Sequence, residues 1–240
     1  MSFGTLYTHN PTPRSTTIRA LAKLNGLDLE IIYAEKTGKD AYEQLCKHNS
    51  LGQVPTFVRA DGYVLSECIP LTLYFASLDE STALLGNDKS DSLEILQWMS
   101  FANSDLFPAI GGVFLPRIGQ RQIIRQDDED SLRAMLRRCR HLDQYLKGRR
   151  CLVGESVTVA DFFTASILMG AYAAFRKRMY EMFPELSAWY EDVCSVGWYK
   201  EVAGEVPDLN LAMPDLEESN EGGAVEKVHN HTRDVKRLEL

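Results

Sequence analysis

The order of strand and helix signals in the first third of the chain is the feature that most restricts its fold. β-type and helix-type runs follow one another as strand, helix, strand, helix, hairpin and helix, at residues 4–8, 13–25, 29–33, 41–48, 56–65 and 66–78. Pro13 is well placed to begin the first helix, with Thr12 as its cap. The Asp61-Gly62 dipeptide is a signal for a two-residue hairpin turn. This order predicts a parallel β-α-β unit followed by an antiparallel hairpin.

The rest of the chain carries helical signals only. A polar stretch at 79–92 indicates a linker, and apolar residues with a helical period follow it. The run from Thr158 to Asp161 has the form of a capping box, with Asp in the place of the usual Glu. We therefore expect an α/β domain and an all-helical bundle domain. The expected boundaries are 1–79 for the α/β domain, 80–92 for the linker, 93–213 for the helical domain and 214–240 for a polar C-terminal extension.

Charge and cysteine usage argue against several classes of protein. The net charge is −8 and the basic runs are short, which disfavours nucleic acid as a partner. The five cysteines have irregular spacing and no CxxC pair, which disfavours a disulfide framework or a zinc site. His229 and His231 lack further ligands, so we predict no metal. Reduced thiols and the lack of a visible signal peptide indicate a cytoplasmic protein. No apolar run approaches the roughly 18 residues of a membrane span, so no membrane partner is expected.

The stretch 49–70 combines features of a peptide-binding site. A cis bond at Val54-Pro55 would leave the main-chain N–H and C=O of Val54 unpaired by the sheet, where an extended peptide could bind as an extra strand. The free N–H groups of the helix that begins near Cys68 attract a carboxylate, and Glu67 could meet an ammonium group. Together these features suit a small zwitterionic peptide. The simpler alternative is that Val-Pro only starts a strand and that Glu67 only faces the helix dipole.

The segments "LGQVPTF" and "DGYVLSECIPLTLYF" resemble the glutathione site of cytosolic glutathione transferases, which join a thioredoxin-like domain to a helical bundle. Within that superfamily, "WMSFANSDL" and "TVADFFTASI" are most similar to the transferase-like domain of the elongation factor 1 gamma subunit. The resemblance implies a homodimer that binds glutathione as co-substrate or cofactor, without a metal. The residues that it implies for glutathione binding are Gln53, Val54, Pro55, Glu67, Cys68 and Asp105.

The resemblance also implies a role for each of these residues. The main chain of Val54 would pair with the cysteinyl unit, and Glu67 with Cys68 would hold the γ-glutamyl end. Gln53 would touch the glycyl end, and Asp105 would reach across the dimer to the amino group of glutathione. Cys68 stands where the family usually has a hydroxyl, and its S–H is a poorer donor, which would weaken binding.

Glutathione chemistry needs a group that favours the thiolate, because a thiol pKa of about 8.5 leaves little thiolate at neutral pH. Thr12-Pro13 matches the Ser-Pro or Cys-Pro of the serine-type and cysteine-type classes, so the Thr12 hydroxyl would be the catalytic donor to the sulfur. The alternative is that Thr12 only caps the helix. The tyrosine of the tyrosine-type classes falls on Thr8, and strand alternation turns Tyr7 to the other face.

A pocket for a second substrate is expected over the cleft between the two domains. Its predicted residues are Tyr7, His9, Arg14, Trp98, Phe101 and Phe107. His9, Asn10 and Arg14 border the first strand-to-helix turn and could polarise the sulfur or a substrate carbonyl. Aromatic residues at such helical spacing also suit a core. The segment 107–120 is expected to be a loop beside this pocket.

Two functions of different classes remain open at this point. The first is a glutathione transferase that adds the thiol to a small hydrophobic electrophile, such as a secondary metabolite, or isomerises it with the help of glutathione. The second is a non-catalytic scaffold and dimerisation module like the gamma-subunit domain. The polar tail after Pro214 does not resemble the lysine-rich linker of that subunit, which favours the enzyme.

Overall fold

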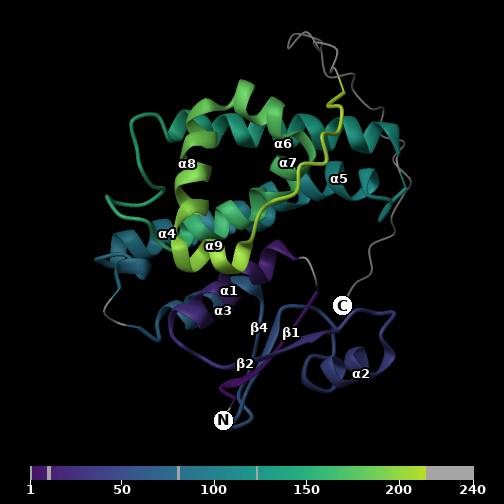
Figure 1. Cartoon of the computed structure of the whole chain (residues 1–240), viewed down its shortest axis with the longest axis vertical. Coiled ribbons are helices and arrows are strands. Elements are labelled where there is room, and N and C mark those ends of the chain that lie inside the picture. Colours follow the sequence, from purple (N-terminus) through teal and green to yellow (C-terminus); the bar gives the residue numbers. More distant parts are fainter. Residues whose placement is uncertain (1, 10–11, 80–81, 123, 215–240) are drawn as a thin grey trace, which may run out of the picture.

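The computed structural model describes residues 2–9, 12–79, 82–122 and 124–214. The molecule has a small α/β half and a larger helical half, stacked one above the other (Figure 1). This arrangement confirms the expected combination of a thioredoxin-like domain with a helical bundle. Within the described residues, no helix is both long enough and apolar enough to cross a membrane.

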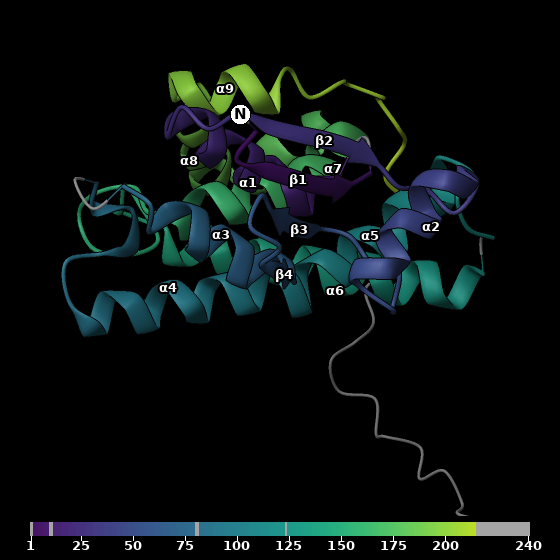
Figure 2. The ribbon, with the colours of Figure 1, turned by 90° about the horizontal axis from the view of Figure 1, so that it is seen from below.

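The sheet has the strand order β2-β1-β3-β4, which Figure 2 shows from one edge to the other. β1 (Gly4–Thr8) pairs in parallel with β2 (Leu29–Tyr33) and antiparallel with β3 (Thr56–Arg59). β3 in turn pairs antiparallel with β4 (Val64–Ser66). The predicted β-α-β unit and the hairpin that follows it are therefore confirmed.

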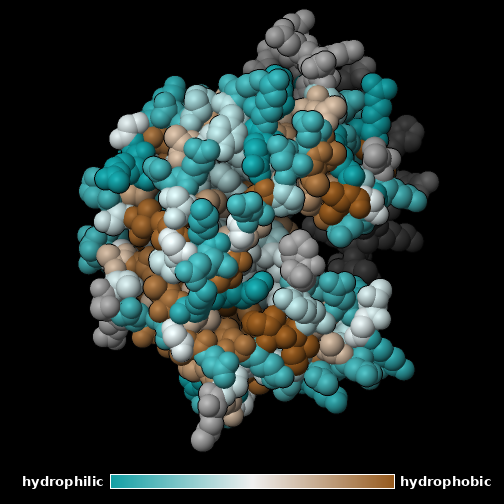
Figure 3. Space-filling model, in the orientation of Figure 1, coloured by the Kyte–Doolittle hydropathy of each residue, from teal (hydrophilic) through white to brown (hydrophobic). Residues whose placement is uncertain are grey.

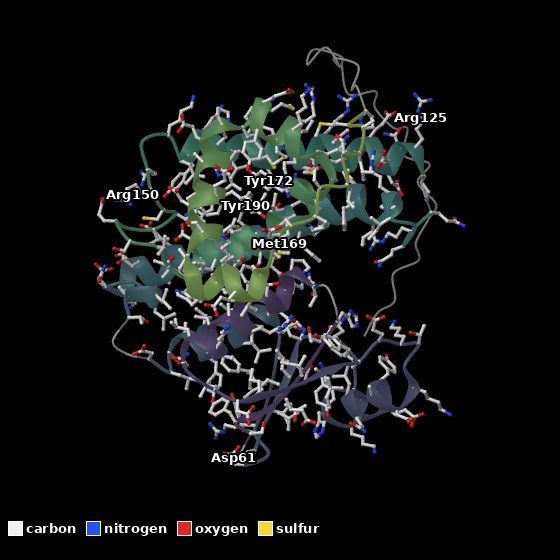
Figure 4. The ribbon with its side chains drawn as sticks, in the orientation of Figure 1. Asp61, Arg125, Arg150, Met169, Tyr172 and Tyr190 are labelled. Atoms are coloured by element: carbon white, nitrogen blue, oxygen red, sulfur yellow. The ribbon has the colours of Figure 1, made fainter. Side chains whose placement is uncertain are left out.

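The turn of this hairpin differs from the two-residue form that was expected. Arg59 N donates to Tyr63 O at 2.8 Å, so the loop between the strands contains the residues 60–62. Gly62 takes the left-handed φ of +92° that a bulged three-residue loop requires at its end. Asp61 lies at the tip, far from the helical half (Figure 4), and its hydrogen bonds to Arg59 lower its pKa to about 2.

The helices of the α/β half cover both faces of the sheet. α1 (Pro13–Leu24) and α3 (Cys68–Ala76) lie between the sheet and the helical half (Figure 1). α2 (Lys39–His48) packs on the other face, where Leu45 contacts the buried ring of Tyr7. Because successive side chains of a strand point to opposite faces of the sheet, Tyr7 of β1 lies on the face covered by α2.

One continuous helical run begins the helical half of the chain. It consists of α4 (Lys89–Phe101), a five-residue π-helical segment η2 (Ala102–Leu106) and α5 (Phe107–Arg117). α4 begins inside the predicted linker, because Asp88 accepts from the N–H groups of Ser90 and Asp91 and starts the helix there. The linker also holds a 3-10 turn, η1 (Ala83–Leu85), and most of the loop expected at 107–120 is the helix α5.

The remaining helices build the core of the bundle: α6 (Arg125–Tyr145), α7 (Val159–Met182), α8 (Pro184–Ser195) and α9 (Gly197–Ala203). α7 is buried on nearly all sides at its start, where the predicted capping box of Thr158 and Asp161 is confirmed. Tyr172 and Tyr190 stack with ring centroids 3.9 Å apart inside this bundle (Figure 4). α9 had no clear signal in the sequence. The predicted C-terminal extension lies outside the described residues from 215 onward.

All five cysteines are unpaired, as the irregular spacing predicted. Cys68, Cys139 and Cys151 are buried, whereas Cys46 and Cys194 are partly exposed. Burial raises the pKa of the Cys139 thiol to about 12 and that of Cys151 to about 11.

Candidate functional site

The loop that leads into β3 is held in shape by its own side chains. Gln53 O accepts hydrogen bonds from Thr56 Oγ1 at 2.8 Å and from Asn49 Nδ2 at 3.3 Å. The Val54–Pro55 peptide bond that follows is cis, and β3 begins only at Thr56. Val54 therefore lies in the loop just before the first paired residue of β3, and its side chain is half-buried. The supporting role of Asn49 was not predicted from the sequence.

The start of α3 brings Glu67 and Cys68 beside this loop. Glu67 is exposed and has a φ of +74°, a left-handed conformation that is uncommon outside glycine and that clusters at functional sites. Cys68 is only 3% exposed, and burial raises the pKa of its thiol. The group is therefore a neutral thiol at physiological pH, and its Sγ donates to Asn103 Oδ1 at 3.4 Å.

Asn103 also holds Arg14, so that three segments of the chain meet at one amide. Arg14 Nε donates to Asn103 Oδ1 at 3.1 Å, and the guanidinium carbon lies 4.1 Å from the centroid of the Phe107 ring. This places the first turn of α1, the start of α3 and the segment η2 around a single cluster. In the described part of the chain, Arg14 forms no ion pair with a carboxylate. Its terminal nitrogens therefore remain available to an anion.

The first strand-to-helix turn carries two threonines with different partners. Thr8 is fully buried and donates to Ser15 Oγ at 2.8 Å. Thr12 occupies the N-cap position of α1, but its side chain makes no capping hydrogen bond. The predicted competition between capping and sulfur activation is thus absent, because the hydroxyl of Thr12 is not used by the helix. His9 is exposed on the same turn, and Asn10 lies outside the described residues.

Three residues predicted for the second-substrate pocket lie elsewhere. Tyr7 is 5% exposed and packs against α2, with its ring centroid 5.8 Å from that of His48. Trp98 is 4% exposed and lies 4.5 Å from Tyr145 between ring centroids, and Phe101 packs against the Trp98 ring. Both α4 rings therefore face α6, which is the core alternative that their spacing also suited.

Asp105 forms an ion pair within its own chain. Its Oδ1 accepts from Arg138 Nη2 at 3.1 Å, and the side chain of Asp105 remains 52% exposed. The carboxylate thus points from η2 toward α6 and is half open to solvent. Its contact with a second copy of the chain stays a prediction.

One face of α5 supplies apolar surface that the sequence reasoning missed. Its members recur at helical spacing and are only partly buried or exposed: Phe107, Gly111, Phe114, Leu115 and Ile118. The opposite face of α5 is buried against the bundle. In the space-filling view, apolar side chains gather over α5 beside the hollow between the two halves (Figure 3). This apolar face was missed because the segment was expected to be a loop, and residues three or four apart share a face only in a helix.

The chain matches known proteins over most of its length. Sequence profiles described as "Glutathione S-transferase, N-terminal domain" and "Glutathione S-transferase, C-terminal domain" match residues 2–74 and 106–196. Glutathione S-transferase mdpJ of Emericella nidulans is 68% identical over 213 residues, which cover 89% of this chain and 96% of that protein. Glutathione S-transferase stcT of the same organism is 42% identical over 89% of this chain and 98% of that protein.

A solved structure gives the same result. The GST-like domain of elongation factor 1-gamma from Saccharomyces cerevisiae has a TM-score of 0.74 and 27% identity, and the match covers 90% of this chain and all of that one (100%). The fold, the two domain profiles and the relatives agree with the resemblance noted from the sequence. The chain therefore belongs to the glutathione S-transferase family.

Proposed function

We propose that this protein is a glutathione transferase that adds the glutathione thiol to a small hydrophobic electrophile. The observation that carries the proposal is the cluster around Asn103, where the start of α3 lies beside Arg14, which forms no ion pair within the described residues. Helix N–H groups and a guanidinium both favour a carboxylate, which is the group at the γ-glutamyl end of glutathione. The exposed Glu67 beside them suits the neighbouring ammonium group.

The loop before β3 supports our proposal for the rest of the tripeptide. Val54 lies before the first ladder pair of β3, so its main chain is placed to bind the cysteinyl unit as an added strand. Gln53 is exposed next to it and suits the glycyl end, while Pro55 is buried and fixes the loop. Arg14 thus changes role, from the second-substrate pocket to the glutathione site. Asp105 would meet the same ammonium group from a second copy of the chain, because we infer a homodimer.

Thr12 is our candidate for activating the thiol. Its hydroxyl is free of capping and lies at the N-terminus of α1, where a hydrogen bond and the helix dipole both favour an anion. In the reaction, the S–H proton passes to water and the sulfur forms a bond to the electrophilic carbon. With an aryl halide, the halide leaves with the bonding pair. His9 remains a second candidate donor at the same turn.

Replacement of Thr12 tests this function. We expect Thr12→Ala to lower kcat/KM with 1-chloro-2,4-dinitrobenzene by about tenfold to a hundredfold, since a hydroxyl donor is worth roughly one to two pKa units of the bound thiol. Thr12→Ser keeps the hydroxyl and should remain near the wild-type value. The measurements are steady-state kinetics, the ultraviolet absorbance of the bound thiolate against pH, and calorimetric titration with glutathione. An unchanged kcat/KM in Thr12→Ala would contradict the proposed role of Thr12. If the wild-type protein does not bind glutathione at millimolar concentration, the proposed transferase function is wrong.

A scaffold like the gamma-subunit domain is the second candidate, favoured by the structural match to that domain. It predicts no turnover across many electrophiles, even where glutathione binds. The enzyme is favoured by the higher identity to the two transferases of Emericella nidulans. We infer a cytoplasmic location for either function, from the unpaired cysteines of the chain.

A further inference from the structure

Gly111 in the middle of α5 has no packing reason to be a glycine. Glycine is a poor residue for a helix interior, so its presence calls for a physical cause. A Cβ at the neighbouring Gly112 would collide with Ser131 on α6, and one at Gly170 would lie 2.9 Å from Ile110 Cγ2. A Cβ at Gly111 would meet only Leu115 Cδ1, at an ordinary contact distance of 3.8 Å. Its φ is also normal for a helix, so the backbone does not require glycine either.

Gly111 instead interrupts the apolar face of α5 at its centre. Phe107 lies one turn before it, and Phe114 with Leu115 lies one turn after it on the same face. Two aromatic residues thus flank a place where the helix backbone is bare. A flat ligand can approach a helix closely only where the side chain is missing.

This bare place is continuous with the glutathione site. Phe107 carries the Arg14 guanidinium on its ring, and Arg14 shares Asn103 with Cys68. Phe107 is the member of the α5 face that contacts Arg14, and Gly111 follows it one turn later on the same face. The distance along the axis from Phe107 to Phe114 is about 10 Å at 1.5 Å per residue, which exceeds the width of one benzene ring.

We propose that Gly111 selects a flat, multi-ring aromatic electrophile as the second substrate. This inference rests on the proposed function, because it assumes that the ligand is joined to, or lies beside, glutathione. The rings lie against the bare backbone at Gly111, between the side chains of Phe107 and Phe114. A larger residue at position 111 would occupy the place of the distal rings and leave the place of the first ring free.

Substitution at Gly111 tests the inference without risk to the fold. A Cβ added at Gly111 makes only an ordinary contact with Leu115 Cδ1, and Gly111→Ala and Gly111→Leu improve helix propensity, so the melting temperature should not fall. Gly197→Leu is the matched control, because position 197 is another helical glycine at which an added Cβ causes no clash, with nothing within 4 Å of it. The probes are S-benzylglutathione, with one ring, and S-(2-anthracenylmethyl)glutathione, with three fused rings. Both are titrated calorimetrically, together with free 2-(hydroxymethyl)anthracene.

We expect wild type and Gly197→Leu to bind the three-ring conjugate more tightly than the one-ring conjugate. Gly111→Leu should raise the Kd of the three-ring conjugate by about tenfold or more and change the Kd of the one-ring conjugate by less than about twofold. Gly111→Ala should have an intermediate effect on the Kd of the three-ring conjugate. Equal affinity for both conjugates in the wild type, or an equal loss of both in Gly111→Leu, overturns the inference. If no glutathione compound binds, the proposed function fails. In that case, the aromatic site is still supported if the free three-ring alcohol binds to the wild type and to Gly197→Leu but not to Gly111→Leu. If the free alcohol does not bind to the wild type, the inference is overturned.

Discussion

At the scale of single residues, the amide of Asn103 joins the two halves of the site. Its Oδ1 has two lone pairs, and it accepts from Arg14 Nε and from Cys68 Sγ. Both lone pairs are therefore used by groups of the α/β half, although Asn103 belongs to the helical half. π-helical segments such as η2 often occur at functional sites because they change the direction of side chains along a helix.

Loss of this amide should loosen Arg14. We expect Asn103→Ala to raise the Kd for glutathione by about tenfold, the worth of one hydrogen bond to a charged group. The fold should persist, since the amide lies at the cleft and not in the core. Asn87→Ala, at an exposed asparagine before α4, is the control. Calorimetric titration gives the Kd, and a value for Asn103→Ala within about twofold of wild type would show that Arg14 needs no such support.

The sequence predicted the members of the site unevenly at this scale. Val54, Pro55, Glu67 and Cys68 occur close together in the chain, so turn and helix-start rules apply to them. Asn103 is separated by 89 residues from Arg14 and by 35 from Cys68, and no local pattern links such positions.

At the scale of elements, the start of α7 is the most strongly determined feature. Both oxygens of Asp161 are buried and each accepts two hydrogen bonds: Oδ1 from Leu152 N and Trp189 Nε1, and Oδ2 from Thr158 N and Thr158 Oγ1. The box was readable from the sequence because its spacing of three residues is local. The ties to Leu152 and Trp189 were not readable, because they depend on the packing of α8 and the preceding loop.

Asp161→Asn should therefore destabilise the protein strongly. The amide NH2 would face two donors in a buried place, which leaves polar groups unsatisfied and lowers the free energy of unfolding by about 3 kcal/mol. Asp192→Asn, at an exposed acid on α8, is the control and should change stability little. Denaturant unfolding provides the measurement. A loss below about 1 kcal/mol would mean that the four donors are satisfied in another way.

Helix boundaries in the first part of the bundle show why other elements could not be predicted. α5 contains two glycines and two prolines, which are typical of turns and loops, and its packing against α6 and α7 stabilises it as a helix. α4 starts earlier than its apolar period because Asp88 caps it with a side chain. Local propensity is a weak guide where tertiary packing decides.

At the scale of the whole molecule, several apolar side chains remain exposed outside the cleft. Leu93 is 58% exposed and Leu96 is 38% exposed, three residues apart on one face of α4, and Leu51 is 71% exposed before β3. Exposed apolar groups of this size are stabilised when a second protein surface covers them. They support the inferred homodimer.

We therefore expect Leu93→Glu to shift the protein from dimer to monomer, because each copy would place a charge in an apolar contact. The sedimentation velocity at micromolar concentration measures the shift. Ile124→Glu changes another exposed apolar residue, 56% exposed at the start of α6, and should leave the assembly intact. A Leu93→Glu protein that sediments like the wild type would place the contact elsewhere.

The burial of the cysteines has a consequence for a protein that handles electrophiles. Such compounds attack thiolates, and a chain rich in accessible thiolate would be alkylated by its own substrates. Burial raises the pKa of the Cys68 thiol, and it raises the pKa of Cys139 to about 12 and that of Cys151 to about 11. These three sulfurs therefore stay protonated and shielded. These three positions of the chain are thereby shielded from alkylation, whereas the partly exposed Cys46 and Cys194 lack that degree of burial.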